Sequence, residues 1–123
     1  MDYPLDVYGA TGQAINNHVI ICGGKIYDIG YKNDCFMMGP KSTISLPNLE
    51  IAKAWTSSAV LRNALFVTGG KFYDKYSIYY NNTEYIAEGK RQTGVSMPIK
   101  VQSHCVIQVN ENEIVLTGGY NSG

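Results

Sequence analysis

The stretch LFVTGGKFYD at Leu65–Asp74 decides the fold, because nearly the same string occurs a second time as VIICGGKIYD at Val19–Asp28. Its first half recurs once more as IVLTGGY at Ile114–Tyr120. Each copy is a short apolar run of β type that stops at a double glycine. The second glycines of successive pairs stand 46 and then 49 residues apart. A recurrence with a period of about 40–50 residues predicts an array of structural repeats.

Apolar runs between turn signals predict four short strands in each repeat, and no stretch shows sustained helical spacing. In the first repeat we expect strands at Gln13–Ile15, Val19–Cys22, Cys35–Met38 and Thr43–Leu46. In the second we expect them at Ser57–Leu61, Leu65–Thr68, Thr83–Ala87 and Thr93–Met97, and a third repeat begins with Cys105–Val109 and Glu113–Thr117. Four-stranded antiparallel units at this period predict an all-β fold made of β-propeller blades.

The three double glycines are expected to be structural. Glycine adopts a positive φ without strain and lets one backbone approach another closely, as the crowded centre of a propeller requires. The six residues are Gly23, Gly24, Gly69, Gly70, Gly118 and Gly119.

The repeats divide the chain into a lead-in segment at residues 1–11, a first blade at 12–48, a second at 49–98 and half of a third at 99–123. Propellers close with about 4–8 blades. An incomplete ring leaves its end faces bare and a sheet edge open at Glu113–Thr117. We therefore expect the ring to be completed by the remainder of a longer chain, or alternatively by other copies of this chain.

The order of a strand pair ending in Gly-Gly, a loop, and two outer strands closed by proline resembles the kelch repeat, over roughly Gly12 to Gly119. SHCVIQVNENEIVLTGGY at Ser103–Tyr120 is especially similar to the inner strand pair of metazoan kelch blades. LPNLEIAKAWTSSAVLRNALFVTGG at Leu46–Gly70 is similar to the junction between two such blades. Phe36 and Tyr85 can take the aromatic position of the outer strands, although no tryptophan follows either. The resemblance implies a kelch-type propeller with an incomplete ring.

Composition and charge exclude several classes of partner. The chain is 45% hydrophobic and 16% charged, and its ten basic and ten acidic residues give a formal net charge of zero. Without clustered Lys and Arg we expect neither nucleic acid nor a membrane surface as a partner. The N-terminus lacks the apolar core of a secretory signal. Together with the odd number of cysteines this favours the cytoplasm, whereas a secreted location is open if the sequence is an internal fragment.

Three cysteines are an odd number, so at least one thiol has no partner within the chain. Cys22 and Cys105 lie inside apolar runs, which favours small buried side chains in the reduced form. A bridge between Cys22 and Cys35 across neighbouring strands is the alternative. The spacing of cysteines and histidines matches no zinc pattern, and we expect neither a metal nor a cofactor.

Candidate binding residues lie in the loops after the first two double glycines, Lys25–Asp34 and Lys71–Asn82. Corresponding loops of a propeller line up on one face, and tyrosine supplies a large contact area with little loss of rotamer entropy. These loops therefore predict a tyrosine-rich rim that recognises a protein partner. The candidate residues are Tyr27, Asp28, Tyr31, Tyr73, Asp74, Tyr76, Tyr79 and Tyr120.

Some of these side chains have a structural alternative. Tyr27 and Tyr73 occur at the same place in both repeats, and we favour packing between blades for this pair. The aspartate that follows each of them could cap a turn. Tyr31, Tyr76 and Tyr79 are not repeated, and for them we favour recognition.

The sequence contains no recognisable catalytic arrangement. There are two histidines and no nucleophile motif, so we expect no catalytic residues. His104 starts an inner strand where kelch blades often carry a histidine, which favours a structural role. Asn81-Asn82-Thr83 is an acceptor sequon for glycosylation, but such triplets often arise by chance, and we do not expect a glycan there.

Two classes of function follow from the resemblance. Kelch propellers similar to this one commonly act as non-catalytic protein-interaction scaffolds, either as substrate adaptors of cullin ubiquitin ligases or as actin-binding proteins. We expect a role of that kind, although the sequence shows neither the BTB domain nor the BACK region of the adaptors. The alternative is a fragment of a kelch-propeller enzyme, such as a copper oxidoreductase similar to galactose oxidase. That reading needs Cys22, His104 and the loop tyrosines to converge.

Overall fold

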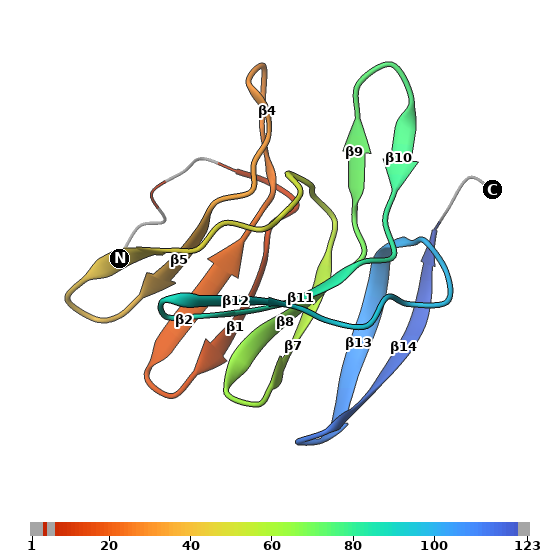
Figure 1. Ribbon diagram of the computed structural model, residues 1–123. Helices are drawn as coiled ribbons and strands as arrows, with labels where there is room; N and C mark the ends of the chain where they lie inside the picture. The colour runs from red at the N-terminus through yellow and green to blue at the C-terminus, as the bar shows by residue number, and fades with distance from the viewer. Residues whose placement is uncertain (1–3, 5–6, 121–123) are drawn as a thin grey trace.

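The computed structural model describes Pro4 and residues 7–120, and this part of the chain is built from antiparallel β-strands (Figure 1). No described residue is helical, so the described part contains no helix that could span a membrane. Three sheets stand side by side without closing into a ring, and two short ribbons project from them. The all-β fold with antiparallel sheets and an incomplete ring is therefore confirmed.

The first sheet has the strand order β1-β2-β5-β6. The third and fourth strands have the bounds predicted from the sequence, and the first two begin slightly earlier. Ile15 pairs with His18, so Asn16 and Asn17 form the expected two-residue turn, with Asn16 at a φ of 54°. The strands are β1 (Thr11–Ile15), β2 (His18–Cys22), β5 (Cys35–Met38) and β6 (Thr43–Leu46).

The second sheet has the order β12-β11-β8-β7. The prediction of its fourth strand at Thr93–Met97 is wrong, because that strand is Lys90–Thr93. Ala87 pairs directly with Lys90 across the turn at Glu88 and Gly89, so the ladder resumes at once. Because this strand is exposed along its whole length, its sequence KRQT shows no apolar alternation. The strands are β7 (Ser57–Leu61), β8 (Ala64–Thr68), β11 (Thr83–Ala87) and β12 (Lys90–Thr93).

The third sheet contains only β13 (Gln102–Asn110) and β14 (Glu113–Tyr120), both longer than predicted. Among the described residues β14 has no partner on its other edge. Strands β1 and β13 both contact β7, so the first strands of the three sheets are neighbours. Apolar side chains between the first and second sheets form the main core, which includes Ile15, Ile20, Leu65, Val67 and Ile86.

The two segments predicted as loops after the double glycines are two-stranded ribbons. The first ribbon pairs β3 (Lys25–Ile26) with β4 (Gly30–Tyr31). The second pairs β9 (Lys71–Tyr73) with β10 (Ser77–Tyr79). Both project from the same end of the sheets, at the top of Figure 1.

The backbone hydrogen bonds at the base of each ribbon repeat from sheet to sheet. Lys32 N–H donates to Gly24 O at 2.8 Å, and Tyr80 N–H donates to Gly70 O at 3.0 Å. Gly24 N–H reaches Lys53 O and Gly70 N–H reaches Val101 O, both at 2.9 Å. For the first two double glycines, the repeat in the sequence is therefore a repeat of hydrogen bonds between the glycines and the segment that leads into the next sheet.

A second repeated contact joins the leading segments to one another. Trp55 N–H donates to Gly9 O and Ser103 N–H donates to Trp55 O, each at 2.9 Å. All three residues have a positive φ, at 70°, 55° and 52° for Gly9, Trp55 and Ser103. Tryptophan rarely adopts this conformation. The packing around Trp55 therefore holds its backbone in place.

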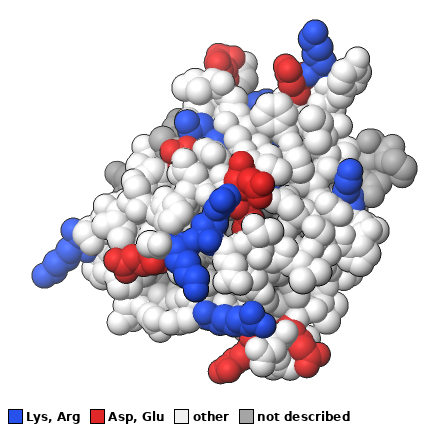
Figure 2. Space-filling view, in the orientation of Figure 1, with Lys and Arg blue, Asp and Glu red and all other residues white. Residues whose placement is uncertain are grey.

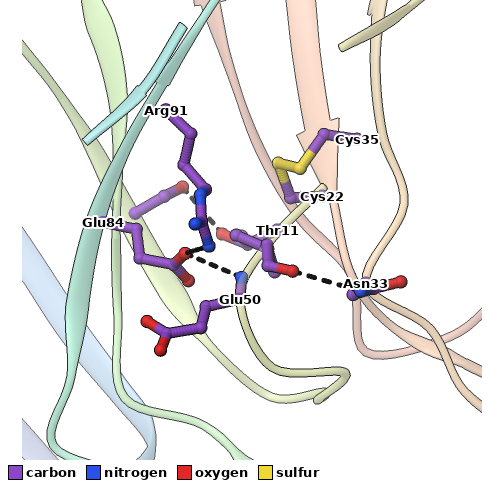
Figure 3. Close-up of a disulfide and its surroundings, with 9 residues drawn as sticks. Thr11, Cys22, Asn33, Cys35, Glu50, Glu84 and Arg91 are labelled. Carbon is purple, nitrogen blue, oxygen red and sulfur yellow. Dashed lines mark hydrogen bonds and ion pairs between the residues drawn. A yellow bond between two sulfur atoms is a disulfide. The ribbon is translucent and has the colours of Figure 1, made fainter. Parts of the chain in front are cut away.

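A buried carboxylate anchors the segment between the first and second sheets (Figure 3). Glu84 on β11 is 1% exposed, and its Oε1 accepts a hydrogen bond from Glu50 N–H at 2.8 Å. The same oxygen lies 3.4 Å from Arg91 Nη1 on β12. Burial makes a charge-assisted bond of this kind stronger than an exposed ion pair.

Cys22 and Cys35 form a disulfide, so the favoured prediction of reduced thiols is wrong and the alternative, a bridge across neighbouring strands, is confirmed (Figure 3). They are directly paired across β2 and β5, and both are buried. In the second sheet the same cross-strand pair is Thr68 and Thr83. The pairing of these strands could be predicted from the sequence, whereas the oxidation of the two facing thiols could not.

Mass spectrometry of the unreduced protein should find Cys22 linked to Cys35, with only Cys105 open to alkylation. Replacing both linked cysteines with the residues of the second sheet, as C22T/C35T, should lower the free energy of unfolding by about 2–3 kcal/mol, since a short loop is no longer closed. Alkylation of all three cysteines in the unreduced, unfolded chain would contradict the assignment.

The need for close backbone approach at the double glycines can be tested by comparison with a glycine that has a similar φ but open space around it. All six have a positive φ. Gly69 has a φ of +65°, and a Cβ there would lie 2.5 Å from Val101 O, whereas Gly89 has a φ of +69° and open space around it. We expect Gly89→Ala to cost about 1 kcal/mol for backbone strain and Gly69→Ala about 2–4 kcal/mol because crowding adds to it. Equal losses in denaturant unfolding would show that close approach does not matter.

Candidate functional site

An open groove of about 600 Å³ lies between the two ribbons, and we call it the ribbon groove. One wall comes from β3, β4 and the turn between them, the other from β9 and Asp74 after it, and Tyr8 contributes from the lead-in segment. Figure 2 shows the ribbon ends carrying charged groups while most of the surface below them is uncharged. The lining residues are Tyr8, Lys25, Tyr27, Asp28, Ile29, Gly30, Tyr31, Phe72, Tyr73 and Asp74.

Aromatic rings beside and within the groove hold the two ribbons together. Tyr31 of the first ribbon packs on Phe72 of the second with ring centroids 4.8 Å apart. Trp55 meets Tyr8 and Tyr31 edge to face at 5.8 and 6.3 Å. These spacings are those of favourable aromatic pairs. The relative position of the ribbons is therefore set by packing before any partner binds.

Two lysines add cation–π contacts to this cluster. Lys25 Nζ lies 5.1 Å from the centroid of the Tyr31 ring. Lys71 Nζ lies 5.8 Å from Trp55 and 5.9 Å from Tyr73. Within the described part of the chain neither lysine forms an ion pair, so their charges act chiefly on the rings.

The structure brings together Tyr27, Asp28, Tyr31, Tyr73 and Asp74, all of which line the groove. The preference for packing between blades was wrong for Tyr27 and Tyr73, which are 76% and 52% exposed. Tyr31 is instead half-buried against Phe72. Tyr27 lies in the turn after β3 whereas Tyr31 is part of β4, a difference that a loop assignment could not anticipate.

Three predicted residues do not line the groove. Tyr76 is at the tip of the second ribbon and is 79% exposed. Tyr79 and Tyr120 face each other with ring centroids 6.0 Å apart, so they connect the second ribbon with the end of β14.

Two residues that build the site, Tyr8 and Trp55, were not predicted as part of it. Tyr8 and Trp55 precede their sheets and were not connected with the ribbons. The signal that could have found Trp55 was its rarity, because it is the single tryptophan of the chain. Its repeat counterparts, Gly9 and Ser103, cannot supply such a ring.

A buried polar cluster lies beneath the second ribbon. Lys53 is fully buried, and its Nζ donates a hydrogen bond to Asn82 Oδ1 at 2.8 Å. Burial lowers its pKa from 10.5 to about 8, although the carboxylates of Glu84 and Glu50 oppose the shift. The hydrogen-bond repeat places Val101 at the equivalent position, so the repeat itself does not require a charge here.

His104 has a structural environment. Its Nε2 lies 2.6 Å from Thr68 Oγ1, and the residue is 5% exposed. Burial and then the charge of Lys53 lower its pKa below the ordinary value. A histidine held neutral against a threonine hydroxyl fits the structural role expected from the sequence.

The geometry gives no support to the copper alternative. Cys22 is bonded to Cys35, and His104 is directed at Thr68. Among residues 7–120 no group of three or more His, Cys, Asp or Glu side chains could hold a metal ion.

The glycosylation sequon is integrated into the fold. Asn81 Nδ2 donates to Met97 O at 3.1 Å, and Asn33 makes the equivalent bond to Leu49 O in the first sheet. Thr83 is 2% exposed and donates to Val95 O. A glycan on the Asn81 amide would therefore disturb one of the bonds that repeat between the sheets.

Comparison with known proteins identifies the fold but no family. No protein-family model and no curated protein matches the chain significantly. The solved structure of YjhT is similar, with a TM-score of 0.77 at 16% sequence identity. The match covers 97% of this chain and 36% of that chain, so this chain spans little more than a third of YjhT. At this level of identity the likeness concerns the fold alone.

The buried position of Lys53 predicts an unusual pH dependence. In the folded protein it loses its proton near pH 8, whereas the ordinary value is 10.5. Between these values the unfolded chain binds more protons, so raising the pH stabilises the fold. The lowered pKa of Lys53 should therefore make the free energy of unfolding about 2 kcal/mol higher at about pH 9.5 than at about pH 7.5. This difference follows from about 1.4 kcal/mol for each pKa unit.

The matched control is Lys53→Met, which keeps the aliphatic stem and removes the titrating group. Subtracting its unfolding curve from that of the wild type, pH by pH, isolates the lysine from other titrating groups. A difference that stays constant across this pH range would show that Lys53 keeps its ordinary pKa.

Proposed function

We propose that the chain is a non-catalytic protein-interaction module built of kelch-like blades, with the ribbon groove as its recognition surface. The sequence resemblance to kelch repeats supports the architecture, and an adaptor or actin-binding role is the family-level form of the proposal. The observation that carries it is the convergence of the two ribbons. Equivalent Tyr-Asp pairs from successive repeats line one open groove, with their tyrosines largely exposed.

The physical properties of the groove suit a protein partner. Exposed tyrosines are typical anchors at interfaces because they combine a large apolar ring with a hydroxyl group. The ring packing of Tyr31, Phe72 and Trp55 fixes the ribbons in advance. A preformed surface loses less conformational entropy on binding than a flexible one. The groove is open rather than enclosed, which suits a segment of a macromolecule.

Site-specific photo-crosslinking tests this function. A photoreactive phenylalanine analogue in place of Tyr27 or Tyr73 should yield defined adducts with a protein in an extract of the source cells. The same analogue at Asn112, in the turn between β13 and β14, should yield none because this turn lies at the opposite end of the sheets (Figure 1). Equal labelling from all three positions would argue against a recognition surface at the ribbons.

Substitution gives the corresponding loss of binding. With the crosslinked partner purified, Tyr27→Ser and Tyr73→Ser should each weaken its affinity by about tenfold, as expected for interface anchors that contribute about 1–2 kcal/mol. Tyr76→Ser is the matched control, since this tyrosine is exposed but does not line the groove. A loss confined to Tyr76→Ser would place recognition at the ribbon tip instead.

A further inference from the structure

Asp28 and Asp74 are carboxylates at equivalent positions of the two ribbons, and both line the ribbon groove. Both are exposed, and neither side chain has an ion pair or a hydrogen bond to another described residue. Asp28 has a positive φ of 64°, which places it within the tight turn of its ribbon. The groove therefore presents one unpaired negative charge from each wall.

The neighbouring lysines form no ion pair with these two carboxylates. Lys25 lines the groove, but its Nζ lies over the Tyr31 ring. Lys71 is directed at Trp55 and Tyr73, and Lys75 does not line the groove although it follows Asp74 in sequence. The two acidic groups remain available to a cation from outside.

Each carboxylate adjoins an exposed tyrosine, since Tyr27 precedes Asp28 and Tyr73 precedes Asp74. Tyrosine faces in this protein already attract cations, because Lys71 Nζ lies 5.9 Å from the Tyr73 ring. A guanidinium group can stack on such a ring and donate paired hydrogen bonds to a carboxylate. Arginine matches this pair of groups better than lysine, whose compact ammonium does not stack.

We propose that the ribbon groove binds an extended peptide segment through arginine side chains, which stack on Tyr27 and Tyr73 and donate hydrogen bonds to Asp28 and Asp74. The inference rests on the proposed function and specifies the chemistry of the partner. A neutral glycan would also stack on the tyrosines, but it would leave both carboxylates without a charged partner. Charge complementarity therefore favours the peptide.

Trp55 provides a built-in reporter for binding. It is the single tryptophan, and it touches Tyr8 and Tyr31, two residues that line the groove. Titration with the blocked pentapeptide Ala-Arg-Ala-Arg-Ala should therefore change its fluorescence. The citrulline counterpart, which keeps the shape but lacks the charge, should bind at least about tenfold more weakly, because two charge-assisted contacts are lost.

Charge-removing substitutions locate the site. Asp28→Asn and Asp74→Asn should each weaken binding of the arginine peptide about two- to fivefold, the range of an exposed ion pair, and the double substitution should weaken it further. Glu88→Gln is the control, because it removes one exposed carboxylate from the turn between β11 and β12. Affinity should also fall with added salt in the wild type more steeply than in the double variant.

Several results would overturn the inference. Equal affinity for the arginine and citrulline peptides, or unchanged affinity in the double variant, would remove the role of the carboxylates. Stronger binding of the glutamate counterpart would assign recognition to the lysines. A response to maltohexaose without any response to the arginine peptide would identify a glycan site.

The inference and the proposed function can fail separately. Crosslinking from Tyr27 to a protein together with no arginine-peptide binding would refute the arginine inference and leave the interaction module standing. Arginine-peptide binding that depends on Asp28 and Asp74, without any protein crosslink at the ribbons, would support the groove chemistry and contradict the module.

Discussion

The fold depends on one backbone contact that is made at each of the first two double glycines. Gly24 and Gly70 donate their N–H groups to Lys53 O and Val101 O, and each bond fastens a sheet to the segment that leads into the next one. A side chain at Gly70 would lie 2.6 Å from Thr56 Cγ2 and 3.0 Å from Ala54 O, so the approach is possible only for glycine. Because the same glycines accept the bonds that close the ribbons, this contact also fixes where the ribbons leave the sheets. The distance between the two ribbons, and with it the width of the groove, is thus set by the way in which the sheets pack side by side.

Most strands could be predicted from the sequence because apolar runs end at recognisable turns. The failures have separate physical causes. The outer strand β12 is exposed on both faces, so KRQT at 90–93 carries no burial pattern. The strands of the ribbons could not be predicted because they are only two or three residues long, which is too short to show an alternation of apolar and polar residues. Their misassignment as loops then reversed the expected roles of Tyr27 and Tyr31. Lys53 gave no signal, since lysines are almost always exposed and the sequence does not show that its stem fills an apolar position.

The two complete sheets have different residue pairs at the same cross-strand position. At the paired position of the first sheet, Cys22 and Cys35 form a covalent link. At the matching position of the second sheet, Thr68 and Thr83 bond instead to His104 and to Val95 O. The second sheet has titratable groups buried beside it, and burial lowers the pKa values of both Lys53 and His104. The first sheet is therefore sensitive to the redox state of its surroundings and the second to pH.

The bonds that close the base of each ribbon have a consequence for divergence. Lys32 N–H to Gly24 O and Tyr80 N–H to Gly70 O are alike, although the second ribbon's strands are longer than the first's. The lower part of each ribbon still contacts the scaffold through Trp55 and Tyr120, whereas a tip such as Tyr76 is largely exposed, so insertions and deletions at the tips should leave the scaffold undisturbed. This fold can therefore accommodate changes in the length of the ribbon tips more readily than changes in the sheets. The same exposure makes the ribbon tips suitable acceptor sites for grafted sequences.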